Sequence, residues 1–517
     1  MPFASQQEFD VYADQLRVDG FTHAPIVRET LADLDTPVST YLKLANKSYS
    51  YLFESVQGGE EWGRYSIIGL PCSTIYRFSG KQMTVQEQTA DGKEVQTVSQ
   101  VEDPFVEIRN IQTNYKVASY PGLPEMIGGL VGYFGYDIIG MSETRLALQE
   151  KPDPIDCPDI LLMVSEEVLV FDNLLGRLFM VALADLSQPD AYQQAQLRLS
   201  NNIQKLGASK LENPIPAVEL DSHQQNYHVH FEQAEFESAV ERCKRYIRDG
   251  DIMQVVLSQR LSTPFEGRSI DVYRALRTIN PSPYMYFMNL GDFDIVGSSP
   301  EILVRLQNDT VTVRPIAGTR KRGTTVEQDQ ALEKELLSDE KELAEHLMLI
   351  DLGRNDVGRI AEIGSVELTE KMNVERYSHV MHIVSNVEAK TCSGCDAIDA
   401  LKATFPAGTV SGAPKIRAME IIAELEPLKR GVYSGAVGYI GWNGNMDTAI
   451  AIRTAVIKDG VLNIQAGAGI VADSVAEYEW KETMSKARAM FKAVEMASTG
   501  LRVGSNSHNS TAMKAGE

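Results

Sequence analysis

The sequence predicts an α+β fold, because strand-like and helical segments mix without the regular alternation of a doubly wound parallel sheet. Residues 167–171 and 178–182 are mainly apolar, include β-branched valines and flank a turn at 173–176, a pattern typical of an antiparallel hairpin. A second hairpin is indicated by Asp459-Gly460 between the strand-like segments 449–457 and 462–466. No short-period repeat is present, which argues against solenoids and propellers.

The composition is that of a globular protein with 517 residues, 43% of them hydrophobic and 23% charged. The net charge of −22 argues against binding to nucleic acid or to anionic membranes. No apolar run approaches the ~20 residues of a membrane-spanning helix. The first ten residues lack a basic segment followed by an apolar one, so we expect no signal peptide and a cytoplasmic location.

Cysteine usage indicates neither a zinc site nor a thiol nucleophile. Five cysteines, an odd number, suit a reducing compartment. Cys392 and Cys395 form an isolated Cys-x-x-Cys, without the second pair that a structural zinc site needs. No cysteine lies in a Gly-x-Cys-x-Gly elbow, a strand-to-helix turn that presents a nucleophile.

Four segments are expected along the chain. Residues 1–205 form an N-terminal region of mixed strands and helices. A polar linker follows at 206–226, where Pro214 and Pro216 lie. Residues 227–498 hold nearly all of the motifs, and the small, polar residues 499–517 are expected to be a disordered tail.

Two pairs of glutamates repeat the same spacing, Glu342 with Glu345 and Glu479 with Glu482. On a helix, residues three apart share a face. Two such faces brought together offer oxygen ligands for Mg²⁺. Taken alone, such a pair more often belongs to a solvated helix face. A di-iron site would need Glu-x-x-His pairs, which neither segment provides.

Arg453 and a small-residue segment at 467–469 form a second candidate. If Asp459 and Gly460 are the hairpin loop, Lys458 pairs with Val461 and Arg453 falls opposite Ala466. A guanidinium beside an open backbone suits a carboxylate or phosphate ligand. A strand arginine reaching into solvent is the alternative.

Two further small-residue turns, at 315–320 and 406–415, could present backbone N–H groups and a threonine hydroxyl to an oxyanion. Neither is a Walker A motif, and no Gly-x-Gly-x-x-Gly opens a helix, so no dinucleotide cofactor is indicated. The second turn precedes a helical run at 416–425.

His382 and Glu301 are candidate proton-transfer groups. His382 lies in an apolar segment, expected to be a strand, where a histidine is more often a core residue than a catalyst. Glu301 begins a strand after Pro300, so its carboxyl could project into a cleft and act as an acid if its pKa is raised.

These segments, in this order, resemble the chorismate-utilising enzymes, and among them the anthranilate synthase component I family. The resemblance spans residues 227–498 and is carried by the strand at 250–258, Ser-Pro-Glu at 299–301 and Pro-Ile-Ala-Gly-Thr at 315–319. It continues through 342–356, 382–385, 405–415, 467–469 and 479–486, with a weaker match at 52–55. The resemblance implies a two-sheet α+β core flanked by helices.

The resemblance also implies ligands and roles. It makes Glu345 and Glu482 the Mg²⁺ ligands, with Glu342 and Glu479 behind them. The catalytic residues implied are Glu301, which protonates the departing 4-hydroxyl of chorismate, together with His382 and Thr409. The chorismate contacts implied are Gly318, Thr319, Tyr433, Arg453, Gly467, Ala468, Gly469 and Lys486. Ammonia then adds at C2, pyruvate leaves, and anthranilate forms for tryptophan biosynthesis.

Two positions separate this reaction from those of related families. Isochorismate and salicylate synthases carry a water-activating lysine where Gln254 stands, and aminodeoxychorismate synthases carry a nucleophilic lysine where Ala317 stands. Anthranilate is therefore the expected product. Aminodeoxychorismate synthase is the alternative enzyme, and a non-catalytic regulator that binds an aromatic amino acid is the alternative outside enzymes.

A separate glutamine amidotransferase subunit is the implied partner, and L-tryptophan the implied feedback inhibitor. The family's inhibitor site uses Leu-Leu-Glu-Ser, whereas this chain has Phe53 in the second position. Inhibition by tryptophan is nevertheless expected. The residues implied for the inhibitor site are Glu54, Ser55, Pro283, Tyr284 and Met285.

Overall fold

The computed structural model describes residues 6–55, 64–89, 92–146, 151–209, 211, 227–377 and 380–501. Most of the linker expected at 206–226 and of the tail expected at 499–517 lies outside these residues, although helix α6 (Ala191–Ala208) reaches into the first of them. Among the described residues, no helix combines the length and the apolar character needed to cross a membrane.

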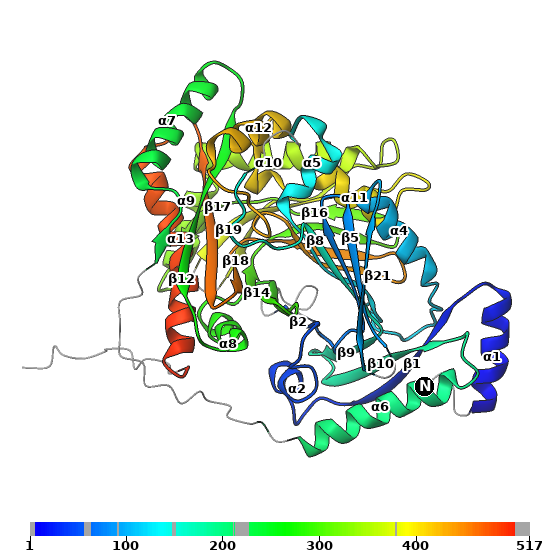
Figure 1. The fold of residues 1–517 in the computed structure, drawn as a ribbon. Coiled ribbons are helices and arrows are strands. Elements are labelled where there is room, and N and C mark those ends of the chain that lie inside the picture. The colour runs from blue at the N-terminus through cyan, green and yellow to red at the C-terminus, as the bar shows by residue number, and fades with distance from the viewer. Residues whose placement is uncertain are drawn as a thin grey trace, which may run out of the picture.

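Two antiparallel sheets of 12 strands each form the body of the molecule (Figure 1). We call the first one sheet A. In spatial order its strands are β1 (His23–Leu31), β10 (Arg177–Asp185), β9 (Glu167–Asp172), β3 (Tyr65–Gly69), β2 (Ser50–Glu54), β13 (Tyr284–Asn289), β14 (Phe293–Ser299), β23 (Thr454–Lys458), β24 (Val461–Ile470), β12 (Gln254–Pro264) and β11 (His228–Val229), with β20 (Gly412–Ala413) also paired to β12.

The second sheet, sheet B, has the spatial order β17 (Ile316–Lys321), β19 (Val380–Lys390), β16 (Thr310–Val313), β15 (Ile302–Gln307), β22 (Met446–Ile450), β21 (Ala436–Gly441), β7 (Gly129–Phe134), β8 (Ile160–Ser165), β4 (Thr74–Ser79), β5 (Gln82–Gln88) and β6 (Glu94–Gln100), with β18 (Glu367–Arg376) on β19. The predicted α+β class and two-sheet core are thus confirmed, and so is the hairpin of β9 and β10, which closes with Asp172 opposite Arg177.

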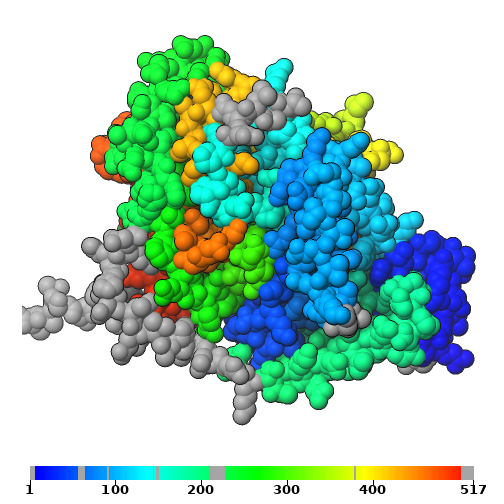
Figure 2. All heavy atoms as spheres, viewed as in Figure 1, coloured from blue at the N-terminus to red at the C-terminus, as the bar shows by residue number. Residues whose placement is uncertain are grey.

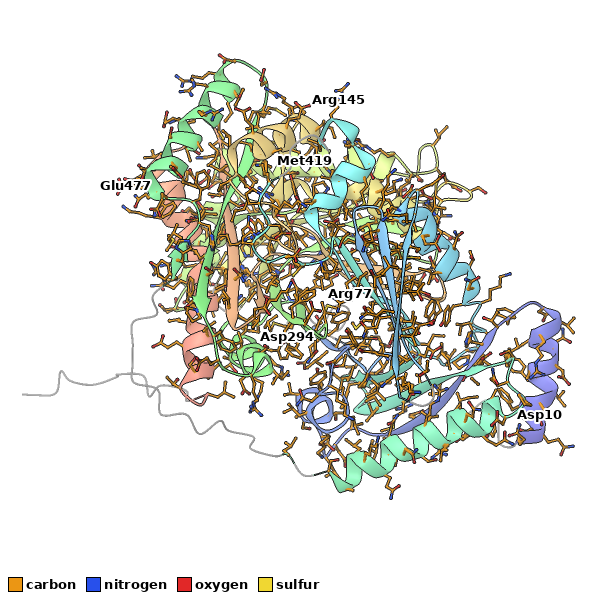
Figure 3. All side chains as sticks on the ribbon, viewed as in Figure 1. Asp10, Arg77, Arg145, Asp294, Met419 and Glu477 are labelled. Carbon is orange, nitrogen blue, oxygen red and sulfur yellow. A yellow bond between two sulfur atoms is a disulfide. The ribbon has the colours of Figure 1, made fainter. Side chains whose placement is uncertain are left out.

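Both sheets combine strands from the N-terminal region and from the region after residue 226. In sheet A, β2 pairs with β13, and in sheet B, β7 pairs with β21. The space-filling view shows the blue and cyan N-terminal residues in direct contact with green and orange residues (Figure 2). Arg77 of β4 in sheet B, labelled near the middle of Figure 3, donates to the carbonyl of Leu290, which follows β13 of sheet A, at 3.0 Å. This bond joins the two sheets.

Helices cover the outer faces. An apolar cluster lies between the sheets, and a second one lies between sheet A and the helices packed on it. The helices are α1 (Gln6–Val18), α2 (Pro37–Leu44), α4 (Pro104–Asn114), α5 (Ile139–Ser142), α6, α7 (Gln233–Arg248), α8 (Ser269–Ile279), α9 (Val326–Leu336), α10 (Glu340–Gly358), α11 (Ala397–Thr404), α12 (Lys415–Leu425) and α13 (Ala476–Ser498), with 3₁₀ turns at Tyr136–Ile138, Thr144–Leu146 and Gly408–Val410.

The helical run predicted at 416–425 is therefore confirmed as α12. The isolated Cys-x-x-Cys lies in the turn before α11, where Cys392 and Cys395 form a disulfide that was not predicted from the sequence.

The two sheets are connected where two neighbouring strands cross from one to the other. Strand β14 of sheet A continues through Pro300 and Glu301 into β15 of sheet B, while β22 of sheet B continues through residues 451–453 into β23 of sheet A. Because β14 pairs with β23 and β15 pairs with β22, the two crossings lie side by side. The Ile450 N–H donates to the Glu301 carbonyl at 3.0 Å, and the Ser298 N–H donates to the Arg453 carbonyl at 3.2 Å.

Candidate active site

Glu301 lies at the crossing from β14 to β15, with its side chain buried. Burial raises the pKa of this carboxyl to about 8. The Thr409 hydroxyl donates to Glu301 Oε1 at 2.5 Å, and the positive charges of Arg453 and Lys486 are close enough to oppose the rise. At neutral pH the carboxyl is therefore largely protonated and able to donate a proton.

Arg453 lies at the neighbouring crossing, and not on a strand. The predicted register of the hairpin is confirmed, since Lys458 pairs with Val461. The predicted pairing of Arg453 with Ala466 is wrong: β23 begins at Thr454, Ala466 pairs with Gln259, and Arg453 has a φ of 50°. The physical reason is that the chain leaves sheet B here and turns into sheet A.

The Arg453 side chain is available for a ligand. Burial lowers the pKa of its guanidinium, and the nearby Glu301 opposes that shift. Within the described part of the chain, no residue accepts a hydrogen bond from this guanidinium. A half-buried cation with unused donors suits a carboxylate.

Gly318, Thr319 and His382 lie together on the paired strands β17 and β19. Residues 316–321 form a strand and not the predicted turn, but a bulge at Gly318, with a φ of 65°, interrupts it. His382 lies on a strand, as predicted, and its Nδ1 donates to the Gly318 carbonyl at 3.0 Å. Burial lowers the pKa of His382, so the ring is neutral and Nε2 is free to accept a proton.

The segment 467–469 belongs to β24 and lies against two polar side chains. A Cβ on Gly467 would come within 2.9 Å of the Tyr433 hydroxyl, and one on Gly469 within 2.6 Å of Gln254 Nε2. Lys486 of α13 donates to the Gly467 carbonyl at 2.9 Å. The two glycines thus leave room beside β24, and Lys486 approaches the same strand from α13. Ala468, which lies between the glycines, is buried.

The four paired glutamates come from the N-terminal parts of α10 and α13, which face each other. Burial and the charges of Glu342 and Glu482 raise the pKa of Glu345, and burial and Glu482 raise that of Glu479. Their partners are Arg320 for Glu342 at 3.1 Å, Gln254 for Glu345 at 3.5 Å and Lys486 for Glu482 at 2.8 Å. Among the residues described, no three His, Cys, Asp or Glu side chains form a group placed to hold a metal ion.

A separate cavity of about 380 Å³ lies near the join of β2 and β13. All five residues expected for an inhibitor line it, namely Glu54, Ser55, Pro283, Tyr284 and Met285. The Glu54 carboxylate is already paired, because it accepts from the Tyr273 hydroxyl at 2.5 Å and from Arg277 at 3.0 and 3.1 Å.

Two residues of these sites carried no sequence signal. The rings of Tyr377 and His382 pack edge to face with their centres 5.4 Å apart, and the Tyr377 hydroxyl donates to Glu375 at 2.9 Å. Arg305 lines the cavity and donates to Asp447, also in its wall, at 2.6 Å. Tyr377 meets His382 because β18 pairs with β19, and Arg305 meets Asp447 because β15 pairs with β22. Sequence spacing does not reveal these strand pairings.

Known proteins share both the sequence and the architecture of this chain. A family described as chorismate binding enzyme matches residues 55–492. Anthranilate synthase component 1 of Pseudomonas putida is 57% identical over 486 residues, which cover 93% of this chain and 97% of the relative.

Solved structures agree in fold. The crystal structure of anthranilate synthase component I from Streptococcus pneumoniae TIGR4 has a TM-score of 0.74 and 39% identity, and the match covers 89% of this chain and 98% of that one. The menaquinone-specific isochorismate synthase of Escherichia coli has a TM-score of 0.66 at 18% identity over 94% of this chain and 99% of that one, so the two share a fold.

Proposed function

We infer that this chain, which belongs to the chorismate-binding enzyme family, is the chorismate-binding subunit of an anthranilate synthase, a lyase of tryptophan biosynthesis. Relatives from several bacteria that are 53–57% identical carry that name. Aminodeoxychorismate synthase is not favoured, and Ala317 offers no nucleophile for its reaction. The balanced reaction converts chorismate and ammonia to anthranilate, pyruvate and water.

The observation that best supports this chemistry is the buried, protonated Glu301 beside the free guanidinium of Arg453. We assign Glu301 the role of acid: it gives its proton to the departing 4-hydroxyl while ammonia adds at C2. Arg453 and Lys486 neutralise the carboxylates of chorismate. His382 Nε2 accepts the C2 proton as pyruvate leaves and the ring becomes aromatic.

The remaining assigned contacts shape the pocket around the ring. Gly318 and Thr319 line the pocket on the side of His382. Gly467, Ala468 and Gly469 line it on the side of Tyr433. Thr409 orients the acid through its hydrogen bond. Gln254 carries no basic nitrogen to activate water, so ammonia is the nucleophile.

The carboxylates on α10 and α13 fit Mg²⁺ by their chemistry. Across the two helices, the charge of Glu482 helps to raise the pKa of Glu345, and within α13 it helps to raise that of Glu479. Mg²⁺ keeps several waters and needs only one or two carboxylates; Glu345 and Glu482 would supply them, with Glu342 and Glu479 behind them. A bound ion would neutralise and orient a substrate carboxylate.

A direct test is to incubate the purified chain with chorismate, Mg²⁺ and ammonium and to separate the products by chromatography. Anthranilate, detected by its fluorescence, should be the main product. Isochorismate or aminodeoxychorismate as the main product would refute the assignment.

The nitrogen source gives a second expected result. Among the described residues no cysteine lies in a nucleophile elbow. Burial raises the pKa of each of the three free thiols, which makes them poor nucleophiles. The isolated chain should use ammonia and fail with glutamine, and a separate amidotransferase subunit should restore glutamine use. Glutamine-dependent turnover by the pure chain would contradict this. We also propose a cytoplasmic location, in which the three free thiols would stay reduced and the Cys392–Cys395 disulfide would be the exception.

We further propose that the 380 Å³ cavity binds tryptophan, so that residues 1–205 contribute regulation and residues 227–498 catalysis, joined by the segment 206–226. Apolar surface for an indole comes from Met285 and Tyr284. Because Glu54 is held by Arg277, we expect it to fix the end of β2 and the position of Ser55.

The cavity has a short connection to the active site. Arg305 and Asp447 form an ion pair in its wall, on the paired strands β15 and β22. Those two strands lead directly to Glu301 and Arg453. A ligand that displaces this pair can therefore bias the crossing where both groups lie.

Ser55→Arg should abolish inhibition by tryptophan and leave turnover unchanged, because a charged side chain fills the cavity and touches no substrate contact. Inhibition curves for wild type and Ser55→Arg test this, with Ser73→Arg outside the cavity as the control. Linkage adds that saturating chorismate weakens tryptophan binding by the factor by which tryptophan weakens chorismate binding. Calorimetry that finds equal tryptophan affinity with and without chorismate would exclude allostery.

A further inference from the structure

Arg430 is a buried cation behind the active site, between α12 and β21, with a side chain only 1% exposed. All five of its N–H donors are used. Nε and Nη2 bind the two carboxylate oxygens of Glu426 at 2.9 and 2.6 Å. Nη1 donates to the Val410 carbonyl at 2.7 Å and to the Ser434 hydroxyl at 3.2 Å, and Nη2 donates to the Val256 carbonyl at 2.9 Å.

The guanidinium also lies against two aromatic rings. Its central carbon is 4.7 Å from the centre of the Tyr136 ring and 5.6 Å from that of Tyr433. Contacts of this kind fix a planar guanidinium in orientation as well as in position.

These contacts lead to three separate parts of the active site. Val410 follows Thr409, whose hydroxyl donates to Glu301. Val256 pairs with Gly469 across β12 and β24. The Tyr433 ring carries the hydroxyl that lies beside Gly467.

Glu426 extends the network to the same two strands. Its Oε1 accepts from both the N–H and the hydroxyl of Ser258 at 2.8 Å, and Ser258 pairs with Gly467. Gln465 of β24 donates to the same hydroxyl at 2.8 Å. One ion pair thus joins the turn at Thr409, the Tyr433 segment and the β12–β24 ladder.

Stability alone is a weak reason for such a pair. Desolvating two charges costs several kcal/mol, and apolar replacements of buried ion pairs are often neutral or stabilising. What an apolar side chain cannot do is hold three backbone segments in fixed relative positions through directed bonds.

We propose that Arg430 is a positioning residue for the reaction, which holds the Thr409 turn against Glu301 while it fixes Tyr433 and the glycine-containing strand around the substrate. This rests on the proposed role of Glu301 as the acid. Thr409 lowers the pKa of Glu301 by its hydrogen bond, so loosening the turn should raise that pKa.

The test measures kcat against pH with unprotonated ammonia held saturating. Arg430→Lys keeps the charge but loses the forked geometry. It should lower kcat on the order of 10- to 100-fold and move the alkaline limb to higher pH. Thr409→Val should move the limb in the same direction. In the double variant Arg430→Lys should add no further shift, because it acts through Thr409.

Arg417→Lys is the matched control, since Arg417 also binds a carboxylate, that of Asp251, and lies over a tyrosine ring, but on the outer side of α12. It should leave the pH profile unchanged. If Arg430→Lys does not fold, Glu426→Gln, which removes the partner charge, should shift the limb in the same direction.

The role of Arg430 would be overturned if neither Arg430→Lys nor Glu426→Gln moves the alkaline limb of the pH profile. It would also be overturned if the shifts of Arg430→Lys and Thr409→Val add fully in the double variant. If Glu301→Gln retains the wild-type limb, the acid itself is misassigned and both proposals fail. Loss of the limb in Glu301→Gln together with an unmoved limb in Arg430→Lys refutes only the positioning role.

Discussion

Replacing Glu301 with glutamine will reduce kcat of the ammonia reaction by about 10²- to 10⁴-fold, the usual contribution of a general acid. The side chain is nearly isosteric and keeps an oxygen for the Thr409 hydroxyl, so the protein should remain folded. What it loses is the proton for the departing hydroxyl. Steady-state rates with chorismate and ammonium, at matched circular dichroism spectra, measure the effect.

The pH dependence follows from the raised pKa. The active, protonated form of Glu301 predominates below pH 8 and is lost as the pH rises through about 8. The wild-type kcat should therefore fall above that pH, and the residual rate of Glu301→Gln should not. Asp294→Asn is the control, because Asp294 is a carboxyl on the adjacent β14 with a pKa raised to about 6 by burial (Figure 3). Activity of Glu301→Gln close to wild type would rule out the acid.

Glu345→Gln and Glu482→Gln will each lower turnover on the order of 10³-fold, because a bound cation contributes several kcal/mol that a neutral amide cannot secure. The amide keeps the shape of the side chain and removes the charge that binds Mg²⁺. Turnover measured against Mg²⁺ concentration should show loss of activity that added metal does not restore.

The matched control for the metal variants is Glu477→Gln on the same helix. Glu477 lies near the N-terminal end of α13, where it is exposed and pairs only with Lys481 among its described neighbours (Figure 3). It should retain wild-type activity and Mg²⁺ dependence. Near-normal turnover of both Glu345→Gln and Glu482→Gln would remove the basis for placing the metal between α10 and α13.

Local patterns in the sequence predicted what depends on local spacing. The hairpin register at Lys458 and Val461, the strand of His382 and the two helix faces with paired glutamates all follow from periodicity and turn chemistry. The wrong position of Arg453 shows the limit. Its strand pattern continues through 449–457, and nothing in that pattern marks the point where the chain leaves one sheet for the other.

Contacts between distant segments were also hidden from the sequence. Glu54 is held by Arg277, which lies on α8, and no spacing rule connects the two. Arg430 and Glu426 are four residues apart, but the Val256 and Val410 carbonyls that Arg430 also binds come from β12 and the Thr409 turn, which no spacing rule connects to it. Such contacts are set by the packing of the whole sheet, so the sequence revealed the candidate groups but not their partners.

The shared construction of both sheets affects how the chain acquires its fold during synthesis. Strands β2 and β7 leave the ribosome long before their partners β13 and β21 exist. Until then each exposes an unpaired edge, which is prone to pair with other chains. Closing ladders over such sequence separations is slow, because loop entropy is lost before native contacts form. The nascent chain should therefore depend on chaperones, and a fragment that begins at residue 227 should aggregate when expressed alone.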